Sequence, residues 1–423
     1  MSAGLATRYA PSFRLILAHF GLGLVGLLLF SAALVWRAGA LSGHFFQPTL
    51  LGLVHLCVLG WLVPVAVGAL HQLVPVVFEV PVRSERTAWV AWALYVPGAV
   101  GFVGHIWWFA TGWGMLASAA LLVAAVWLYA GNLLATLARA ARVTLTGAYV
   151  IAALCWLLVA ASLGFALAWN LHAPYLYVDH LQWLRAHAHA AGLGFFVLLV
   201  MGVAYRLLEM FLLSYVDRTR PGQVALVAIN LALAALLVSF VFGRVLALAV
   251  AGVAAAAVGV AAFLWQVGRL WRARTRRRAD TAWRHTALAF AYLVVVLCAG
   301  AAAALARPPG PWRERLELAY GFLALCGFAS SVVVGQLYKI APFLVWFHRF
   351  SAYVGLKQVP AASELLAEAP QRAQWLLMHL GVAALAAGIA VASGPLRLAG
   401  AALFLASSAL FARNIWVIYR RKP

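Results

Sequence analysis

An internal repeat that occurs three times is the feature of this sequence that most limits its fold. Segments 55–78, 189–211 and 322–345 align with one another without gaps. Each repeat has a glycine followed by an aromatic residue, a second glycine eight residues after the first, and a histidine or tyrosine three residues further on. Self-similarity at a fixed spacing is stronger evidence of architecture than a single-residue motif. The matching positions are Gly60-Trp61, Gly194-Phe195 and Gly327-Phe328, then Gly68, Gly202 and Gly335, then His71, Tyr205 and Tyr338.

The composition indicates that this repeat lies in a membrane. Hydrophobic residues make up 66% of the 423 and charged residues 10%, far from the mixture of a soluble globular chain. Apolar runs of about 20 residues are long enough to cross a bilayer as helices. We therefore predict an all-α integral membrane protein with twelve transmembrane helices at residues 13–36, 49–78, 87–109, 112–137, 145–170, 184–214, 222–243, 245–271, 283–306, 316–347, 373–393 and 395–419.

The twelve predicted spans fall into three groups of four within a single membrane domain. The groups cover approximately residues 1–142, 143–278 and 279–423. The repeat occupies the second span of each group, which is span 2, 6 or 10, so its three copies cross the membrane in the same direction. This pattern predicts three pseudo-threefold-related groups of helices, with the first residue of each repeat at the same depth.

The net charge of +21 raises the question of nucleic-acid binding, but the positions of the charges argue against it. Basic residues concentrate in the even-numbered loops and at both termini, and Arg83, Arg86, Arg139 and Arg142 are examples from the even loops. This asymmetry is the positive-inside pattern. We expect a multi-pass protein of a bacterial-type inner (plasma) membrane with both termini cytoplasmic. Its expected partner is the lipid bilayer, and we expect it to bind no nucleic acid.

Two histidines occupy equivalent positions of the repeat inside predicted spans. His55 begins the first copy, His189 begins the second, and Phe322 begins the third. An ionisable side chain at membrane depth is costly and is by default a functional candidate. His187 precedes His189 by two residues, so the two side chains point in nearly opposite directions on a helix. They are not expected to ligate one metal from one face, and either of them is a candidate ligand on span 6.

These histidines are candidate metal ligands, and a b-type haem fits them best. Neutral imidazole ligates haem iron, copper or zinc. Two helices that each offer one histidine, with apolar and aromatic walls, are typical of a haem held by axial imidazoles, here between spans 2 and 6. No C-x-x-C-H motif supports covalent attachment. Arg185, one turn before His189, and Arg397, between spans 11 and 12, lie at the right level to pair with the haem propionates.

Two stretches of the sequence resemble subunit I of the haem–copper oxidases and nitric oxide reductases. They are HLCVLGWLVPVAVGALHQLVP in span 2 and HAHAAGLGFFVLLVMGVAYRLLEMF in span 6. The resemblance covers the whole chain in topology, as twelve spans in three arcs of four, while similarity of residues is confined to the repeats. It implies that His55 matches the span-2 ligand of a low-spin haem, and that His187 or His189 occupies the place of a copper ligand.

The chain departs from that family at the remaining ligand positions. The family supplies further axial histidines from span 10, where this chain reads Ala319-Tyr320-Gly321-Phe322. It supplies paired copper histidines from span 7, where residues 222–243 contain none. No complete copper ligand set can be assembled from the matching positions. The resemblance therefore implies a divergent, stand-alone member that lacks the full binuclear centre, and it disfavours oxygen reduction coupled to proton pumping.

We therefore expect a haem b-binding membrane protein for electron transfer or for nitric oxide or oxygen handling, with a periplasmic electron donor as its partner. If it is an enzyme, it is an oxidoreductase. A secondary transporter is one alternative, although such folds usually have two-fold repeats around a midplane site. A haem- or copper-delivery factor is another, although only five methionines and no cysteine cluster are present, which weakens a route for soft metals.

Overall fold

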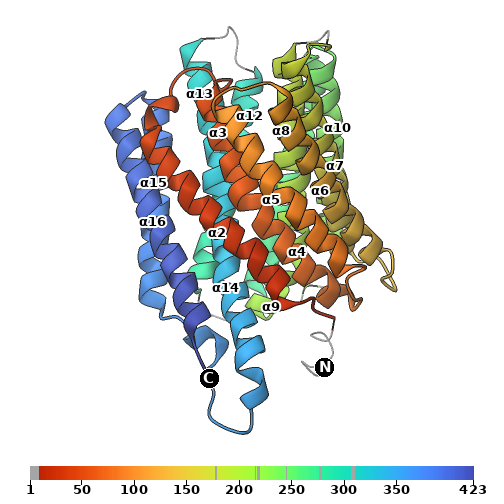
Figure 1. Ribbon diagram of the computed structural model, residues 1–423, viewed down its shortest axis with the longest axis vertical. Coiled ribbons are helices and arrows are strands. Elements are labelled where there is room, and N and C mark those ends of the chain that lie inside the picture. The colour runs from red at the N-terminus through yellow and green to blue at the C-terminus, as the bar shows by residue number, and fades with distance from the viewer. Residues whose placement is uncertain are drawn as a thin grey trace. The chain divides into compact units, whose positions relative to one another are not determined.

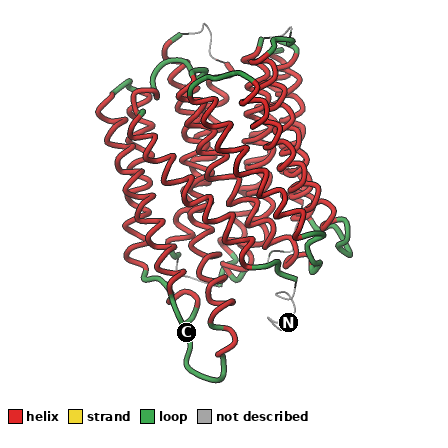
Figure 2. Tube along the Cα trace, viewed as in Figure 1, coloured by secondary structure: helices red, strands yellow, loops and turns green. Residues whose placement is uncertain are grey.

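The chain folds into helices joined by short loops. The computed structural model describes residues 9–176, 179–214, 216, 220–243, 245–275, 279–305 and 310–423. Within these ranges there is no β-strand, and extended pairing is limited to an isolated bridge between Val354 and Lys357. Figure 2 shows the described chain as helix and loop only. The all-α prediction is confirmed.

Twelve helical stretches of the described residues are long and apolar enough to cross a membrane. Each begins and ends within five residues of a span predicted from the sequence. Three of them, Pro48–Phe78, His180–Leu212 and Pro311–Arg349, contain a π-helical segment. The other nine are α2 (Phe13–Trp36), α5 (Glu85–Trp107), α6 (Trp113–Leu137), α7 (Leu145–His172), α10 (Arg220–Val241), α11 (Leu246–Arg272), α12 (Thr281–Leu305), α15 (Glu368–Ala390) and α16 (Gly394–Arg420).

Side-chain caps fix where several of these helices begin. At the start of α5, Ser84 Oγ accepts a hydrogen bond from the Thr87 N–H at 3.1 Å. At the start of α7, Thr144 Oγ1 accepts from the Gly147 N–H at 3.2 Å. Such a cap satisfies one of the N–H groups that the first helical turn leaves without a partner. The helix starts are therefore encoded locally, in addition to the length of the apolar run.

Contacts divide the chain into two compact units. The first unit comprises Met1–His19 and Val67–Arg277, and the second comprises Phe20–Ala66 and Arg278–Pro423. In the first unit, α5 packs along α6, α10 packs along α11, and α7 packs against span 6. In the second unit, α12 packs against span 10, and α15 packs along α16, the blue pair in Figure 1.

Each copy of the internal repeat contains the same helical irregularity. A π-helical segment begins at the residue after His55, His189 or Phe322. A π-turn adds about one residue to a helical turn, so it rotates the side chains that follow by about 100°. Such segments occur frequently at functional sites. The elements are α3 (Pro48–His55), η2 (Leu56–Leu62) and α4 (Val63–Phe78) in span 2; α8 (His180–His189), η3 (Ala190–Val197) and α9 (Leu198–Leu212) in span 6; and α13 (Pro311–Phe322), η4 (Leu323–Ala329) and α14 (Ser330–Arg349) in span 10.

The first glycine of each repeat lies inside its π-helical segment and contacts the span that precedes it. A Cβ added at Gly194 would approach Cβ of Trp156 on α7 at 2.7 Å, and one added at Gly327 would approach the ring of Tyr292 on α12 at 3.0 Å. In span 2, Gly60 meets another glycine, Gly26 of α2. Small residues let two helices in a membrane approach closely. Close approach of neighbouring spans therefore accounts for the repeated glycine.

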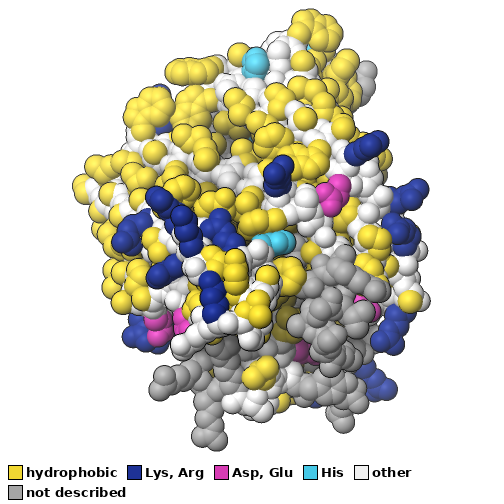
Figure 3. Space-filling view, turned by 60° about the horizontal axis from the view of Figure 1, so that its bottom comes forward, with side chains coloured by type: hydrophobic (Ala, Val, Ile, Leu, Met, Phe, Trp, Pro, Cys, Tyr) yellow, Lys and Arg dark blue, Asp and Glu magenta, His cyan; other side chains and the backbone are white. Residues whose placement is uncertain are grey.

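The surface of the described residues carries many large apolar side chains. Trp36, Trp113 and Trp265 are each more than half exposed. Figure 3 shows Lys and Arg side chains set among broad hydrophobic surface. Apolar surface of this extent is rare on soluble monomers and marks a surface that contacts membrane or protein. Together with the twelve apolar helices, it indicates a multi-pass membrane protein.

Candidate functional site

His55 and His189 occupy the same structural position in their repeats. Each is the last residue of an α-helix, His55 before η2 and His189 before η3. His55 Nδ1 lies 2.8 Å from the carbonyl oxygen of Leu51, and His189 Nδ1 lies 2.8 Å from that of Arg185. In both cases the carbonyl belongs to the residue one helical turn earlier. Both side chains are half-buried. The equivalence of the two histidines in sequence therefore extends to their side-chain conformation.

These hydrogen bonds determine which ring nitrogen can act as a ligand. A carbonyl oxygen only accepts, so Nδ1 of each ring donates and carries the proton. In the neutral ring the lone pair is then on Nε2. A metal-ligating histidine almost always donates its other N–H to a carbonyl, a carboxylate or water. Both His55 and His189 therefore have the arrangement of a ligand that binds a metal through Nε2.

His187 is arranged differently from His189. Its Nδ1 lies 2.9 Å from the carbonyl oxygen of Ala160 on α7, and a Cβ added at Gly164 on the same helix would approach His187 Cε1 at 3.0 Å. The His189 ring instead packs against Phe240 of α10, with centroids 5.0 Å apart. The two rings diverge, as their spacing predicts. His189 shares the geometry of His55, and it is therefore the better candidate for the span-6 ligand.

The two arginines expected beside a haem differ in their surroundings. Arg185 is half-buried on α8, one turn before His189. Arg397 is only 8% exposed in the first turn of α16, and its Nε has no hydrogen-bond partner among the described residues. A buried guanidinium N–H without an acceptor is costly. The position of Arg397 is therefore suited to a bound anion.

The predicted site residues are divided between the two compact units. His55 and Arg397 belong to the second unit, whereas Arg185, His187 and His189 belong to the first. Joint ligation of one iron by His55 and His189 stays a prediction.

Further along the same three spans, each repeat contributes one ring to a buried cluster. Each cluster takes one ring from the first, second and fourth of four consecutive spans, and all members of a cluster belong to one unit. The clusters are His19, His71 and Tyr129 on α2, α4 and α6; Tyr149, Tyr205 and Phe263 on α7, α9 and α11; and His285, Tyr338 and Phe411 on α12, α14 and α16, with centroids 5.2–6.1 Å apart between the second-span ring and its two neighbours.

In the second and third repeats, the second glycine makes room for the ring cluster. A Cβ added at Gly202 would collide with the side chain of Tyr149, and one added at Gly335 would approach Cβ of His285 at 2.9 Å. Tyr149 and His285 are the ring-bearing residues that the preceding span contributes. The repeated glycine and the repeated ring three residues later are therefore two parts of one packing arrangement.

In the first cluster, two imidazoles lie beside a phenol, and all three side chains are at most 2% exposed. His19 Nδ1 donates to the Leu15 carbonyl at 2.8 Å, and its Nε2 accepts from the Tyr129 hydroxyl at 2.8 Å. His71 Nδ1 donates to the Val67 carbonyl at 2.9 Å. Among the described residues, His71 Nε2 has no hydrogen-bond partner. One buried nitrogen lone pair of this cluster is therefore unsatisfied.

The third cluster extends into a directed chain of hydrogen bonds. Gln374 Oε1 accepts from His285 Nε2 at 3.0 Å, which leaves His285 Nδ1 to accept from His379 Nε2 at 3.2 Å. His379 Nδ1 in turn accepts from the Tyr292 hydroxyl at 3.3 Å. Both nitrogens of both imidazoles are used. This cluster is thus saturated, unlike the first.

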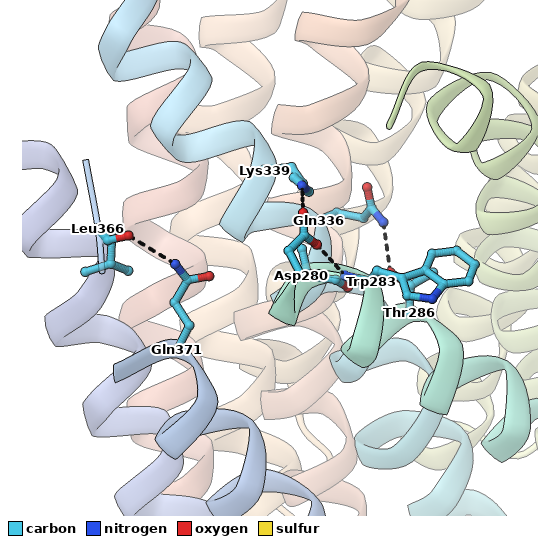
Figure 4. A network of polar contacts seen from close by, with 8 residues as sticks. Asp280, Trp283, Thr286, Gln336, Lys339, Leu366 and Gln371 are labelled. Carbon is cyan, nitrogen blue, oxygen red and sulfur yellow. Dashed lines mark hydrogen bonds and ion pairs between the residues drawn. The ribbon is translucent and has the colours of Figure 1, made fainter. Parts of the chain in front are cut away.

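Further polar contacts join the start of α12 to α14 (Figure 4). Asp280 accepts from the Trp283 N–H at 3.0 Å and forms an ion pair with Lys339. Gln336 Nε2 donates to Thr286 Oγ1 at 3.2 Å. A charged side chain within a span is costly unless it is paired. The ion pair therefore compensates Lys339 and ties α14 to the start of α12.

The sequence identifies His71 as a position of the repeat and does not single out His19, His285 or His379. A signal for the first two clusters is nevertheless present. Tyr129 follows His71 by the same 58 residues by which Phe263 follows Tyr205. An alignment of the first two groups that continues from the second span to the fourth would therefore predict the two fourth-span rings, Tyr129 and Phe263. The first-span rings have no such common spacing, because the loops between the first two spans differ in length.

Comparison with known proteins does not place the chain in a family. No protein-family model matches its sequence, and no curated protein sequence matches it. The resemblance to oxidase subunits therefore remains an expectation that rests on the two stretches in spans 2 and 6.

Proposed function

We propose that the chain is an integral membrane protein that binds haem b, with His55 and His189 as iron ligands. The observation that carries this proposal is the shared geometry of the two residues. Each ends an α-helix before a π-helical segment and donates from Nδ1 to the carbonyl one turn earlier. That geometry leaves on Nε2 the lone pair with which an axial histidine binds haem iron. Electron transfer, or the handling of nitric oxide or oxygen, is the role that follows.

Two further observations support a haem. A Cβ added at Gly192, three residues after His189, would meet no atom within 4 Å, so space is open beside that stretch of the helix. Arg397 is buried, and its Nε has no acceptor in the described part of the chain, so it is suited to a propionate. A bound haem would supply a redox-active iron. The chain's own residues would hold it, orient its ligand rings through the Leu51 and Arg185 carbonyls, and surround it with apolar side chains.

The proposal includes the arrangement in the membrane. The three repeats, with their equivalent π-helical segments and ring clusters, favour three groups of four spans related by a pseudo-threefold axis. The excess of arginine in the even loops favours cytoplasmic termini and an inner membrane of bacterial type. His55 and His189 then lie toward the periplasmic side, where an electron donor has access to them. The lipid bilayer is the partner of the apolar surface.

The test is a reduced-minus-oxidised visible spectrum of detergent-purified protein expressed with ample haem. We expect the Soret and α bands of a b-type haem. His55→Ala and His189→Ala should each reduce the haem content about tenfold or more. Loss of an iron ligand is expected to lower the affinity for haem at least as much as loss of a residue that hydrogen-bonds to a ligand. Carbon monoxide added to the reduced protein should leave the bands unshifted if both axial positions are histidine.

His187→Ala is the matched control, because it removes an imidazole two residues away that binds the Ala160 carbonyl instead. Its haem content is expected to equal that of the unmodified chain. If His187→Ala loses haem and His189→Ala keeps it, the assignment of the span-6 ligand is wrong. Absence of haem from the unmodified protein would sink the proposal, and a secondary transporter or a haem- or copper-delivery factor would take its place.

A second prediction concerns Arg397. Arg397→Gln is expected to weaken haem retention severalfold without moving the α band, because the residue would bind a propionate and not the iron. In the haem-free protein the same change should leave the melting temperature unchanged or raise it, since no described residue accepts a hydrogen bond from Arg397 Nε. Arg372→Gln is the control, because Arg372 is exposed and pairs with Glu368 at 2.8 Å. Equal haem affinity in the two variants would contradict the role of Arg397.

A further inference from the structure

The first ring cluster differs chemically from its two counterparts. It holds two imidazoles and a phenol. The second cluster holds no imidazole. In the third cluster, both ring nitrogens of His285 are hydrogen-bonded. His71 is fully buried, and no described residue donates a hydrogen bond to its Nε2. A buried acceptor without a donor calls for a specific explanation in a native structure. A bound cation is one such explanation.

The two imidazoles are arranged so that both lone pairs are on Nε2. Each Nδ1 donates to a carbonyl of its own helix, His19 to Leu15 and His71 to Val67. Each Nε2 therefore lies on the other side of its ring, away from that carbonyl. The ring centroids are 5.9 Å apart and the ring planes differ by 26°. With a metal–nitrogen distance of roughly 2.0 Å, two imidazoles on opposite sides of one ion place their centroids about 6 Å apart.

The ligands available restrict the identity of the metal. The described residues contain no group of three or more His, Cys, Asp or Glu side chains that could hold an ion, so two imidazoles are the core of the site. Zinc prefers four ligands, and calcium and magnesium require oxygen cages. A doubly charged ion between neutral ligands at membrane depth would also remain uncompensated. Copper(I) carries a single charge and accepts two nitrogen ligands in a nearly linear arrangement.

We propose that His19 and His71 bind a copper(I) ion through their Nε2 atoms, inside the first compact unit. The Tyr129 hydroxyl donates to His19 Nε2 at 2.8 Å and therefore uses the lone pair that copper needs, so it must move aside when copper binds. Tyr129 is therefore a competitor for the site and not a ligand. The site is independent of the proposed haem, because none of its residues is a haem ligand.

The other two clusters provide substitutions that the fold already accommodates. The residues equivalent to His71 are Tyr205 and Tyr338, the first-span ring of the second cluster is Tyr149, and the fourth-span rings are Phe263 and Phe411. His71→Tyr, His19→Tyr and Tyr129→Phe thus each install a side chain that stands at the corresponding place in another cluster. Phenol is a poor ligand for copper(I), so the histidine variants remove one donor each while they keep an aromatic ring.

The experiment titrates the full chain in detergent with copper(I) under anaerobic, reducing conditions, against a colorimetric copper(I) chelator. We expect one tightly bound ion per chain. His71→Tyr and His19→Tyr should each bind it at least a hundredfold more weakly. Tyr129→Phe should bind it about fivefold more tightly, since it removes one neutral hydrogen bond that copper must displace. His285→Tyr is the control and should leave the affinity of this ion unchanged.

X-ray absorption of the copper-loaded, unmodified protein provides a readout that needs no variant. We expect it to show two nitrogen neighbours around the copper ion. Copper binding that is equally tight in His71→Tyr would overturn the proposal. Weaker binding by Tyr129→Phe would show that the phenol is a ligand, and zinc bound more tightly than copper(I) would show that the metal is assigned wrongly. The haem spectrum should be unchanged in all of these variants, so that failure of this proposal is distinguishable from failure of the proposed function.

Discussion

Replacing Gly26 by alanine is expected to destabilise the protein by about 3 kcal/mol or more, the upper end of what overpacking normally costs. A Cβ on this residue of α2 would collide with the carbonyl group and Cα of Gly60 in η2. All of these are backbone atoms, which cannot turn away as the end of a flexible side chain can. The two helices must therefore separate, and every contact between them weakens.

The effect of Gly26→Ala should extend to the proposed haem ligand. The segment η2 begins at the residue after His55, so a displacement of Gly60 moves the helix end that carries the imidazole. We expect the variant to retain less haem than the unmodified chain even where it remains folded. Unfolding of the detergent-solubilised protein by heat or SDS gives the stability, and the visible spectrum of the same sample gives the haem content.

Gly21→Ala is the control for this prediction. Gly21 lies on the same helix, is exposed, and would meet no atom within 4 Å with an added Cβ. Because alanine favours helix over glycine by roughly 1 kcal/mol, this change should leave the stability unchanged or raise it. If Gly26→Ala behaves like Gly21→Ala, the close approach of α2 and η2 is wrong.

The fold is predictable from the sequence as far as apolar length and local spacing determine it. The span at Phe13–Trp36 matches its prediction at both ends because its apolar run stops at charged or polar residues. The start of the span at Pro311–Arg349 lies five residues before its prediction, because Arg313 and Glu317 form an ion pair at 3.3 Å within the first turns. Hydropathy counts such residues as loop, although pairing lets them continue a helix.

The candidate site is predictable only where the repeat aligns equivalent residues. His55 and His189 emerge because they share a repeat position. His19, His285 and His379 lie on spans outside the aligned segments, and only the packing of α12 against α15 brings His285 and His379 together. The π-helical segments are also hidden from composition, since LCVLGWL reads as ordinary apolar helix. The glycine inside each of them contacts a neighbouring helix, which is a tertiary contact that composition does not reveal.

Replacing His379 by leucine is expected to destabilise the protein by about 2–4 kcal/mol. His379 is the middle member of the chain from the Tyr292 hydroxyl to His285 and Gln374. Its loss leaves the fully buried His285 Nδ1 without a donor and the Tyr292 hydroxyl without an acceptor. Each buried polar group left unsatisfied costs about 1–3 kcal/mol. Unfolding in detergent, followed by tryptophan fluorescence, measures the difference.

Two further variants separate this cost from simple loss of volume. Tyr292→Phe removes only the terminal donor, so it should cost about 1 kcal/mol. The double variant His285→Leu/His379→Leu should cost less than the sum of the two single changes, because each single change breaks the same His285–His379 hydrogen bond and strands the partner. If the two changes are strictly additive, the hydrogen bond between the imidazoles contributes nothing. In that case ring packing, of the kind that joins Tyr149, Tyr205 and Phe263 in the second cluster, is what holds the two imidazoles together.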